Sequence, residues 1–145
     1  MNRYPAHRQY NQVQIKTANK GKLIVLLYQG AIRYMKKAKQ QLAERDMEGK
    51  GNSLIRAQDI VLELLYALDQ TLLDEGNELA VNLQRLYLYS YRRLIHANTH
   101  LDSDAIDEVV ELLNNLLEAW EKVATGGDGG GGLSAQSRSA VALTG

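Results

Sequence analysis

The stretch from residue 17 to residue 35 constrains the fold more than any other part of the chain. It contains an unbroken apolar run from Leu23 to Tyr28 and continues with mixed residues to Met35. A helix that lies on a core needs only one apolar stripe, whereas the first half of this one is apolar on nearly every side. It must therefore be covered from several directions, partly by a bundle and partly by the chain's own N-terminal arm or another polypeptide.

The composition is that of a single helical domain. The chain has 145 residues, with eight Tyr, one Trp, one Pro and no Phe, and this length suits one domain with a real core. Cysteine is absent, which excludes a disulfide framework, thiol zinc sites and thiol nucleophiles. The first residues lack the apolar core of a signal peptide, and no apolar run is long enough for a membrane span. We expect a soluble cytoplasmic protein without direct membrane insertion.

The formal net charge is zero, but the charges are unevenly distributed. Residues 1–50 carry eleven Lys or Arg against three Asp or Glu, whereas residues 51–145 carry six against fourteen. Pairing of basic and acidic faces across a bundle explains this division. RNA binding by the basic region is the competing explanation, but Lys36, Lys37 and Lys39 lack the interleaved aromatics and Gly-rich loops of nucleic-acid modules. We therefore expect no nucleic acid partner.

The first helix is predicted to begin near Asn19, whose side chain can cap the first turn. Its inward stripe has the three-then-four spacing of a bundle helix and consists of Ile24, Leu27, Tyr28, Ala31, Met35, Ala38 and Leu42. The apolar residues Leu23, Leu26 and Ile32 lie off this stripe. Gly30 costs roughly 1 kcal/mol relative to Ala in a helix interior, so either a neighbouring helix backbone approaches closely there or the position simply tolerates Gly.

The second helix is predicted to follow a turn at residues 48–53, capped by Asn52 or Ser53. Its inward stripe is Leu54, Ala57, Val61, Leu64, Leu65, Leu68 and Leu72, and its other faces carry Ile55, Ile60, Leu62 and Tyr66. The next break spans residues 74–77, where Gly76 supplies the C-terminal turn and Asn77 the following cap.

Two further helices complete the pattern. The third places Leu79, Leu83, Leu86, Tyr87, Ser90, Leu94 and Ala97 inward, with Leu88, Tyr89 and Tyr91 on its other faces, and ends near Asn98. The acidic cluster Asp102–Asp104 marks the next helix start, because cap oxygens and negative charge suit the positive end of a helix. The fourth helix has an inward stripe of Ile106, Val109, Leu113, Leu116, Trp120 and Val123, and a wetter face with Glu108, Glu111, Glu118 and Glu121.

These segments predict an all-α fold, an antiparallel up-down four-helix bundle with a short N-terminal helical arm. We divide the chain into the arm at 1–16, the bundle at 17–124 and a Gly-rich flexible tail at 125–145. Tyr10 and Val13 lie three residues apart on one face of the expected arm helix.

The glycines of the tail are incompatible with a stable helix. We expect a flexible linker followed by a disordered C-terminal stretch. The competing expectation is that Leu133, Val141 and Leu143 fold back onto an apolar groove of the bundle.

No pattern in the chain predicts chemistry. His96 and His100 are four residues apart, as a metal site requires, but the first lacks an adjacent Glu and a favourable interaction with the helix C-terminus explains both. The inward stripes are apolar, whereas a di-metal bundle needs inward carboxylates. The glycines of the tail precede no helix and lack the Lys-Ser/Thr of a phosphate-binding loop. We expect no enzyme, no catalytic residues, no metal and no cofactor.

The surplus of apolar residues on the first three helices predicts a partner site or an oligomer contact. Grooves between helices receive amphipathic or extended segments of a partner. A mobile arm or a second copy of the chain could cover the same surface, which leaves a dimeric structural or regulatory helical bundle as the alternative function.

An ordered set of short matches resembles the FliS family of flagellin-specific export chaperones. The matching segments are Tyr10–Val13, Thr17–Ala18, Leu23–Ile24, Leu27–Arg33, Lys36, Ala38, Ala57–Ile60, Glu63–Leu64, Leu68–Asp69, Asn82–Leu83, Leu86–Tyr87, Tyr89, Arg93–Leu94, Ala97–Asn98 and Trp120. They span roughly residues 4–124. The family usually has Ser-Pro where this chain has Asn19 and Lys20, and the Gly-rich tail lies outside the family's common pattern.

The resemblance implies a one-to-one complex with the disordered C-terminal segment of flagellin, which displaces the N-terminal arm from its groove. It also implies that the protein keeps flagellin unpolymerised and delivers it to the type III export gate through the cytoplasmic domain of FlhA. Weak self-association stays open.

Site residues follow from the resemblance and from the off-stripe positions. The groove anchors are Leu23, Leu26, Ile55, Leu62 and Tyr91, the displaceable plug is Tyr10 and Val13, and the polar contacts are Gln12, Thr17, Asn82, Arg93 and Asn98. Each polar residue has an equally good interpretation as a cap or staple within the bundle.

Overall fold

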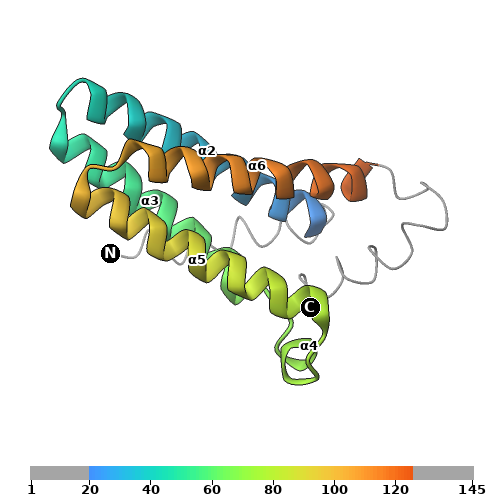
Figure 1. Cartoon of the computed structure of the whole chain (residues 1–145). Coiled ribbons are helices and arrows are strands. Elements are labelled where there is room, and N and C mark those ends of the chain that lie inside the picture. Colours follow the sequence, from blue (N-terminus) through green and yellow to red (C-terminus); the bar gives the residue numbers. More distant parts are fainter. Residues whose placement is uncertain (1–19, 126–145) are drawn as a thin grey trace, which may run out of the picture.

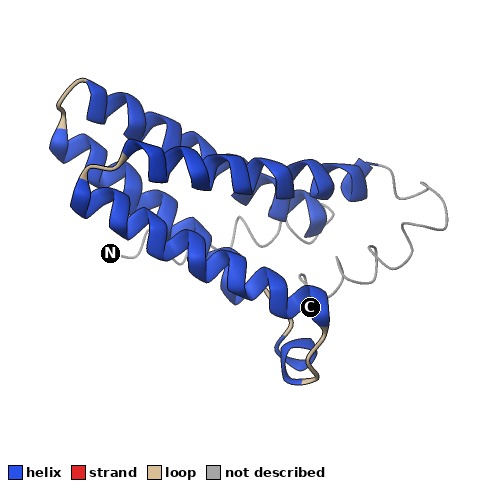
Figure 2. Ribbon diagram, viewed as in Figure 1, coloured by secondary structure: helices blue, strands red, loops and turns tan. Residues whose placement is uncertain are grey.

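The computed structural model describes residues 20–125, without the side chains of the last two, and this part of the chain consists of helices and short loops (Figure 2). The helices are α2 (Lys20–Ala43), α3 (Met47–Tyr66), α4 (Gln70–Asp74), α5 (Glu78–His100) and α6 (Ser103–Thr125). The arm with Tyr10 and Val13, the cap at Asn19 and the tail lie outside the described residues. The division into arm, bundle and tail therefore stays a prediction.

The four long helices form the predicted antiparallel bundle (Figure 1). Helix α2 packs against α3 and α6, and α5 packs against the same two helices, so that α2 and α5 face each other across the core. The ion pair of Lys39 with Asp107, at 2.7 Å, joins the basic α2 to the acidic α6. This confirms for one pair that the two charge classes meet across the bundle.

The core is built from all four long helices, and its largest polar feature is a pair of tyrosines. Tyr28 of α2 and Tyr87 of α5 are fully buried, and their hydroxyl oxygens lie 2.6 Å apart, so that one hydroxyl donates to the other. Burial raises the pKa of Tyr28 to about 12, although Tyr87 and Trp120 act to lower it. Burial, and then the proximity of Tyr28, holds the pKa of Tyr87 well above its usual value.

Most residues of the predicted stripes are buried in the core or pack against it, which confirms them. The inward residues that do neither are Leu42, Leu72, Leu79, Leu86 and Val123. Ile32 was placed off the stripe, but it is only 6 % exposed. It lies one turn after Tyr28, and α2 has two neighbouring helices to cover it. Leu79 was placed inward but is 39 % exposed, because Ala80, three residues before Leu83, occupies the inward position in the first turn of α5.

The turn predicted at residues 48–53 is wrong, since α3 begins at Met47. The cap is Asp46, whose carboxylate accepts a hydrogen bond from the Gly49 N–H at 3.0 Å. A Cβ at Gly49 would crowd this carboxylate and the Gln41 amide. The glycine therefore serves helix packing rather than a turn, and Ser53, buried and hydrogen-bonded to Gln41 at 2.7 Å, cannot be the cap.

The second predicted helix is also too long. Helix α3 ends at Tyr66, and the Asp69 carboxylate starts the separate helix α4 by accepting from the Thr71 N–H at 2.8 Å. The next break is confirmed: Gly76 has a φ of 74° and the Asn77 side chain caps α5.

Helix α6 starts as predicted, because the Asp102 carboxylate caps it by accepting a hydrogen bond from the Ala105 N–H at 3.1 Å.

Gly30 of α2 faces a side chain of α3. A Cβ at Gly30 would meet Ile60 Cδ1 at 3.4 Å, which is ordinary van der Waals contact with a side chain. The neighbouring backbone therefore does not require a glycine at this position.

Candidate binding surface

The seam between α3 and α5 is fixed by a buried lysine. Lys50, only 5 % exposed, donates from Nζ to the backbone oxygen of Asn98 at 3.1 Å and to its Oδ1 at 2.6 Å. A cation at the C-terminal end of α5 is favoured by the helix dipole. Because the two helices are antiparallel, this contact sets their register.

An exposed apolar row follows this seam. Met47 lies three residues before Lys50 and Leu101 three residues after Asn98, so the two are opposite each other at one end of the seam. Further along, helical spacing places Ile55 and Leu62 on the α3 side and Tyr91 and Ile95 on the α5 side. The exposed fractions are 39 % for Met47, 51 % for Leu101, 48 % for Ile55 and 42 % for Ile95. We call these six residues the α3/α5 row.

The predicted groove anchors do not form one group. Ile55, Leu62 and Tyr91 belong to the α3/α5 row, and Tyr91 also packs partly against the core. Leu23 and Leu26 instead lie near the start of α2, where Leu26 is 62 % exposed and Leu23 is half-buried.

Three members of the α3/α5 row were missed by the sequence prediction. Ile95 follows Tyr91 by one helical turn, and this spacing could have identified it. Met47 and Leu101 gave no such signal, because each lies at a helix end whose position only the structure defines.

The predicted polar contacts have different environments. Asn98 accepts from Lys50, and Arg93 Nε donates to Glu108 Oε1 at 2.9 Å, so both join helices within the bundle. Asn82 is exposed on α5. Gln12 and Thr17 lie outside the described residues.

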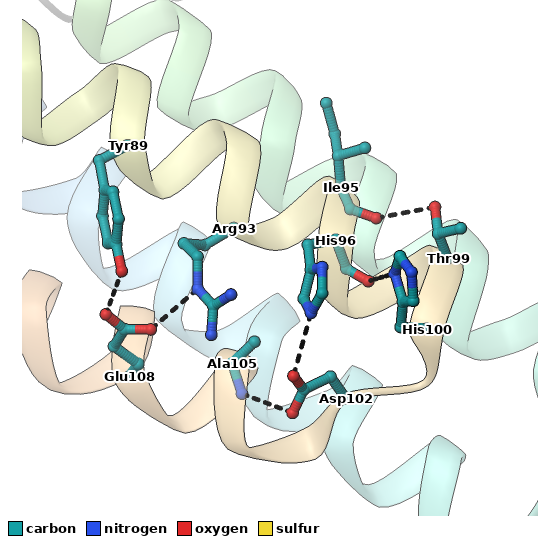
Figure 3. A network of polar contacts seen from close by, with 9 residues as sticks. All are labelled: Tyr89, Arg93, Ile95, His96, Thr99, His100, Asp102, Ala105 and Glu108. Atoms are coloured by element: carbon teal, nitrogen blue, oxygen red, sulfur yellow. Dashed lines mark hydrogen bonds and ion pairs between the residues drawn. The ribbon is translucent and has the colours of Figure 1, made fainter.

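A polar network joins α5 to α6 near their connecting turn (Figure 3). Tyr89 donates a short hydrogen bond to Glu108, which raises the pKa of Tyr89 and, together with Arg93, lowers that of Glu108. The Ala105 N–H holds the pKa of Asp102 below its usual value, and His96 acts in the same direction. These exposed contacts fix the two helices to each other.

The two histidines at the end of α5 belong to the same network. His96 Nε2 lies 3.1 Å from Asp102 Oδ2, and His100 Nδ1 lies 3.2 Å from the backbone oxygen of His96 (Figure 3). Their rings stack with centroids 4.3 Å apart. Within residues 20–125, no group of three or more His, Cys, Asp or Glu residues is placed to hold a metal ion.

The comparison with known proteins identifies the family of this chain. A family model described as "Flagellar protein FliS" matches residues 2–127. The chain belongs to the FliS family. This confirms the resemblance found in the sequence, and the FliS match ends within the first residues of the Gly-rich tail.

Individual FliS relatives agree with this assignment. The chain is 34 % identical over 113 residues to the flagellar secretion chaperone FliS of Bacillus subtilis, covering 78 % of this chain and 81 % of the relative. It is 38 % identical over 120 residues to that of Salmonella typhimurium, with coverages of 79 % and 87 %. It is 37 % identical over 123 residues to FliSB of Pseudomonas aeruginosa, with coverages of 82 % and 95 %.

Membership of the FliS family makes the chain a flagellar export chaperone rather than an enzyme. Of the helices in the described part, none is long and apolar enough to cross a lipid bilayer. The α3/α5 row and the α2 residues Leu23 and Leu26 are the exposed and half-buried apolar positions that we consider as a candidate binding surface.

Proposed function

We propose that this chain binds the disordered C-terminal segment of flagellin in the cytoplasm as a one-to-one complex. Binding prevents premature polymerisation, and the complex is then delivered to the flagellar type III export apparatus. The observation that carries the proposal is the α3/α5 row, whose most exposed members, Ile55, Ile95 and Leu101, are 42–51 % exposed. Apolar surface of this kind on a chaperone of the FliS family supports capture of an apolar segment.

The row suits a segment that is disordered when free. Its members extend along two helices rather than around one pocket, and a chain that folds on binding can wrap such a surface. Burial contributes roughly 25 cal/mol per Å² of apolar area and is partly offset by the entropy of ordering the segment. Leu23 and Leu26 provide anchors for a segment that continues onto α2.

Calorimetric titration of the full chain with a peptide of the flagellin C-terminal segment tests this proposal. We expect one peptide per chain and a negative heat-capacity change, because apolar surface is buried. Ile95→Asp should weaken binding by at least about tenfold, as loss of a central anchor does. Leu79→Asp is the matched control, since Leu79 is also on α5 and is 39 % exposed, but lies on the α6 side. Absence of heat at micromolar concentrations would refute flagellin binding.

The N-terminal arm, with Tyr10 and Val13, is proposed to occupy the groove until flagellin displaces it. Replacing both residues by Ser in the full chain should strengthen peptide binding, because the competing contact is lost. Unchanged affinity would contradict the plug.

Delivery is proposed to use the cytoplasmic domain of FlhA. In a pull-down with that domain, the flagellin-loaded chain should be retained more strongly than the empty chain. Equal retention of the two forms would contradict the loading-dependent step.

A further inference from the structure

The seam between α5 and α6 changes from polar to apolar along its length. Its polar half carries the contact of Arg93 with Glu108 of α6 and that of His96 with Asp102, the residue just before α6 (Figure 3). Leu86 and Leu79 precede Arg93 by seven and fourteen residues, which is two and four helical turns, so both lie on the same side of α5. Beyond the polar network, this side of α5 therefore presents leucines to the seam.

The facing side of α6 is apolar over the same length. Leu112, Ala119 and Val123 follow Glu108 by four, eleven and fifteen residues and share its face. Glu108 pairs with Arg93, and the helices are antiparallel, so these residues continue toward the end of α6 as the leucines continue toward the start of α5. We call Leu79, Leu86, Leu112, Ala119 and Val123 the open seam.

The open seam is incompletely covered by the described part of the chain. Leu79 is 39 % exposed, Ala119 is exposed, and the other three residues are half-buried. All five lie outside the core cluster and outside the set of side chains that pack against it. A contiguous apolar surface of this kind calls for a covering segment.

The C-terminal tail of the chain begins next to this seam, because it follows directly on α6. Helix α6 ends at Thr125, two residues after Val123. Residues 126–132 are six Gly and one Asp, and seven residues span at most about 25 Å, which is enough to return along α6. The tail then supplies Leu133, Val141 and Leu143, its only aliphatic residues larger than Ala.

Two further observations favour the tail as the occupant. Its single basic residue, Arg138, would lie beside the acidic outer face of α6, where Glu111 and Glu118 are exposed. The N-terminal arm instead precedes α2, which borders α6 on the side away from α5. The apolar residues of the tail also lie beyond residue 127, where the family match ends.

We propose that residues 133–143 fold back and pack Leu133, Val141 and Leu143 onto the open seam of α5 and α6. This intramolecular contact covers the apolar surface of the open seam. It is a different surface from the α3/α5 row, and it does not depend on what the row binds.

A spin label tests the contact in the full chain, because the sequence has no cysteine that would compete for the label. In Ser139→Cys carrying a nitroxide, the amide signals of residues 79–86 and 112–123 should lose most of their intensity relative to the reduced label. The same label in a chain that also carries Leu133→Ser, Val141→Ser and Leu143→Ser is the matched control. There the intensity of residues 79–86 should recover, since apolar packing holds the tail in place.

Three results would overturn the proposal. The first is signal loss confined to the last turn of α6, and the second is loss at residues 79–86 that persists in the triple Ser chain. The third is loss of the seam's amide signals with a label on the arm, at Gln9→Cys, together with no loss of these signals with the tail label at Ser139→Cys. Because the readout is made without flagellin, failure of the flagellin proposal leaves this test unaffected.

Discussion

The buried tyrosine pair gives the most quantitative prediction. Tyr28 and Tyr87 are 0 % and 1 % exposed, and their hydroxyls are hydrogen-bonded at 2.6 Å. Changing either residue to Phe removes one hydroxyl and strands the other away from water. A stranded buried hydroxyl costs about 1–3 kcal/mol, whereas removal of both partners is nearly neutral.

The two single changes should not be equivalent. Trp120 also interacts with the Tyr28 hydroxyl, so Tyr87→Phe leaves Tyr28 with a remaining partner. Tyr28→Phe removes the side-chain hydroxyl to which Tyr87 is hydrogen-bonded. We expect a loss of about 2 kcal/mol for Tyr28→Phe, about 1 kcal/mol for Tyr87→Phe and no more than about 1 kcal/mol for the double variant.

Urea unfolding followed by the fluorescence of Trp120, the only tryptophan in the chain, measures these differences. For a slope of about 2 kcal/mol per molar urea, each 1 kcal/mol shifts the midpoint by roughly 0.5 M. The result that would refute the reasoning is a double variant whose loss equals the sum of the two single losses, because independent residues add and coupled residues do not. A changed slope would show instead that the variants alter the unfolded or native ensemble.

Three further predictions concern stability. Gly30→Ala should raise the free energy of unfolding by about 1 kcal/mol, because Ala is the better helix former. Gly49→Ala should lower it by about 1 kcal/mol, because the added Cβ disturbs the cap of α3. Urea midpoints that move in the same direction for both variants would contradict the packing described. Ser90→Ala should raise stability by about 1 kcal/mol, since the buried Ser90 hydroxyl has no hydrogen-bond partner among the described residues, and a lowered thermal midpoint would argue against this. The pKa of Tyr28 is raised from 10.0 to about 12 in the folded protein, and that of Tyr87 is raised well above 10.0. The stability contribution of the pair is therefore intact below pH 10 and is lost as the pH rises above 10, at up to about 1.4 kcal/mol per pH unit for each tyrosine. The double Phe variant should show a flatter decline of stability above pH 10 in denaturant titrations.

Much of the bundle could be predicted from the sequence because the information is local. The three-then-four spacing identified Tyr28, Met35, Leu94 and Leu113 as core residues, and all are fully buried. Asn77 was recognised as a cap because a helix start depends on one side chain and the next few N–H groups. Local signals failed at residues 48–53, where Gly49 and Gly51 resembled a turn but lie within α3, and Gly49 leaves space for the cap of that helix. The same kind of signal was correct at Gly76, whose φ is 74°.

Whether an apolar residue outside the predicted stripes is buried or exposed was decided only by the tertiary structure. Ile32 and Leu26 look alike in the sequence, yet one is 6 % and the other 62 % exposed. Helical periodicity fixes the direction of a side chain on its own helix, but burial depends on which other helix stands in that direction. The same reason explains why the sequence alone identified Ile55, Leu62 and Tyr91 as surplus apolar residues, whereas only the register set by Lys50 and Asn98 brought them into one row.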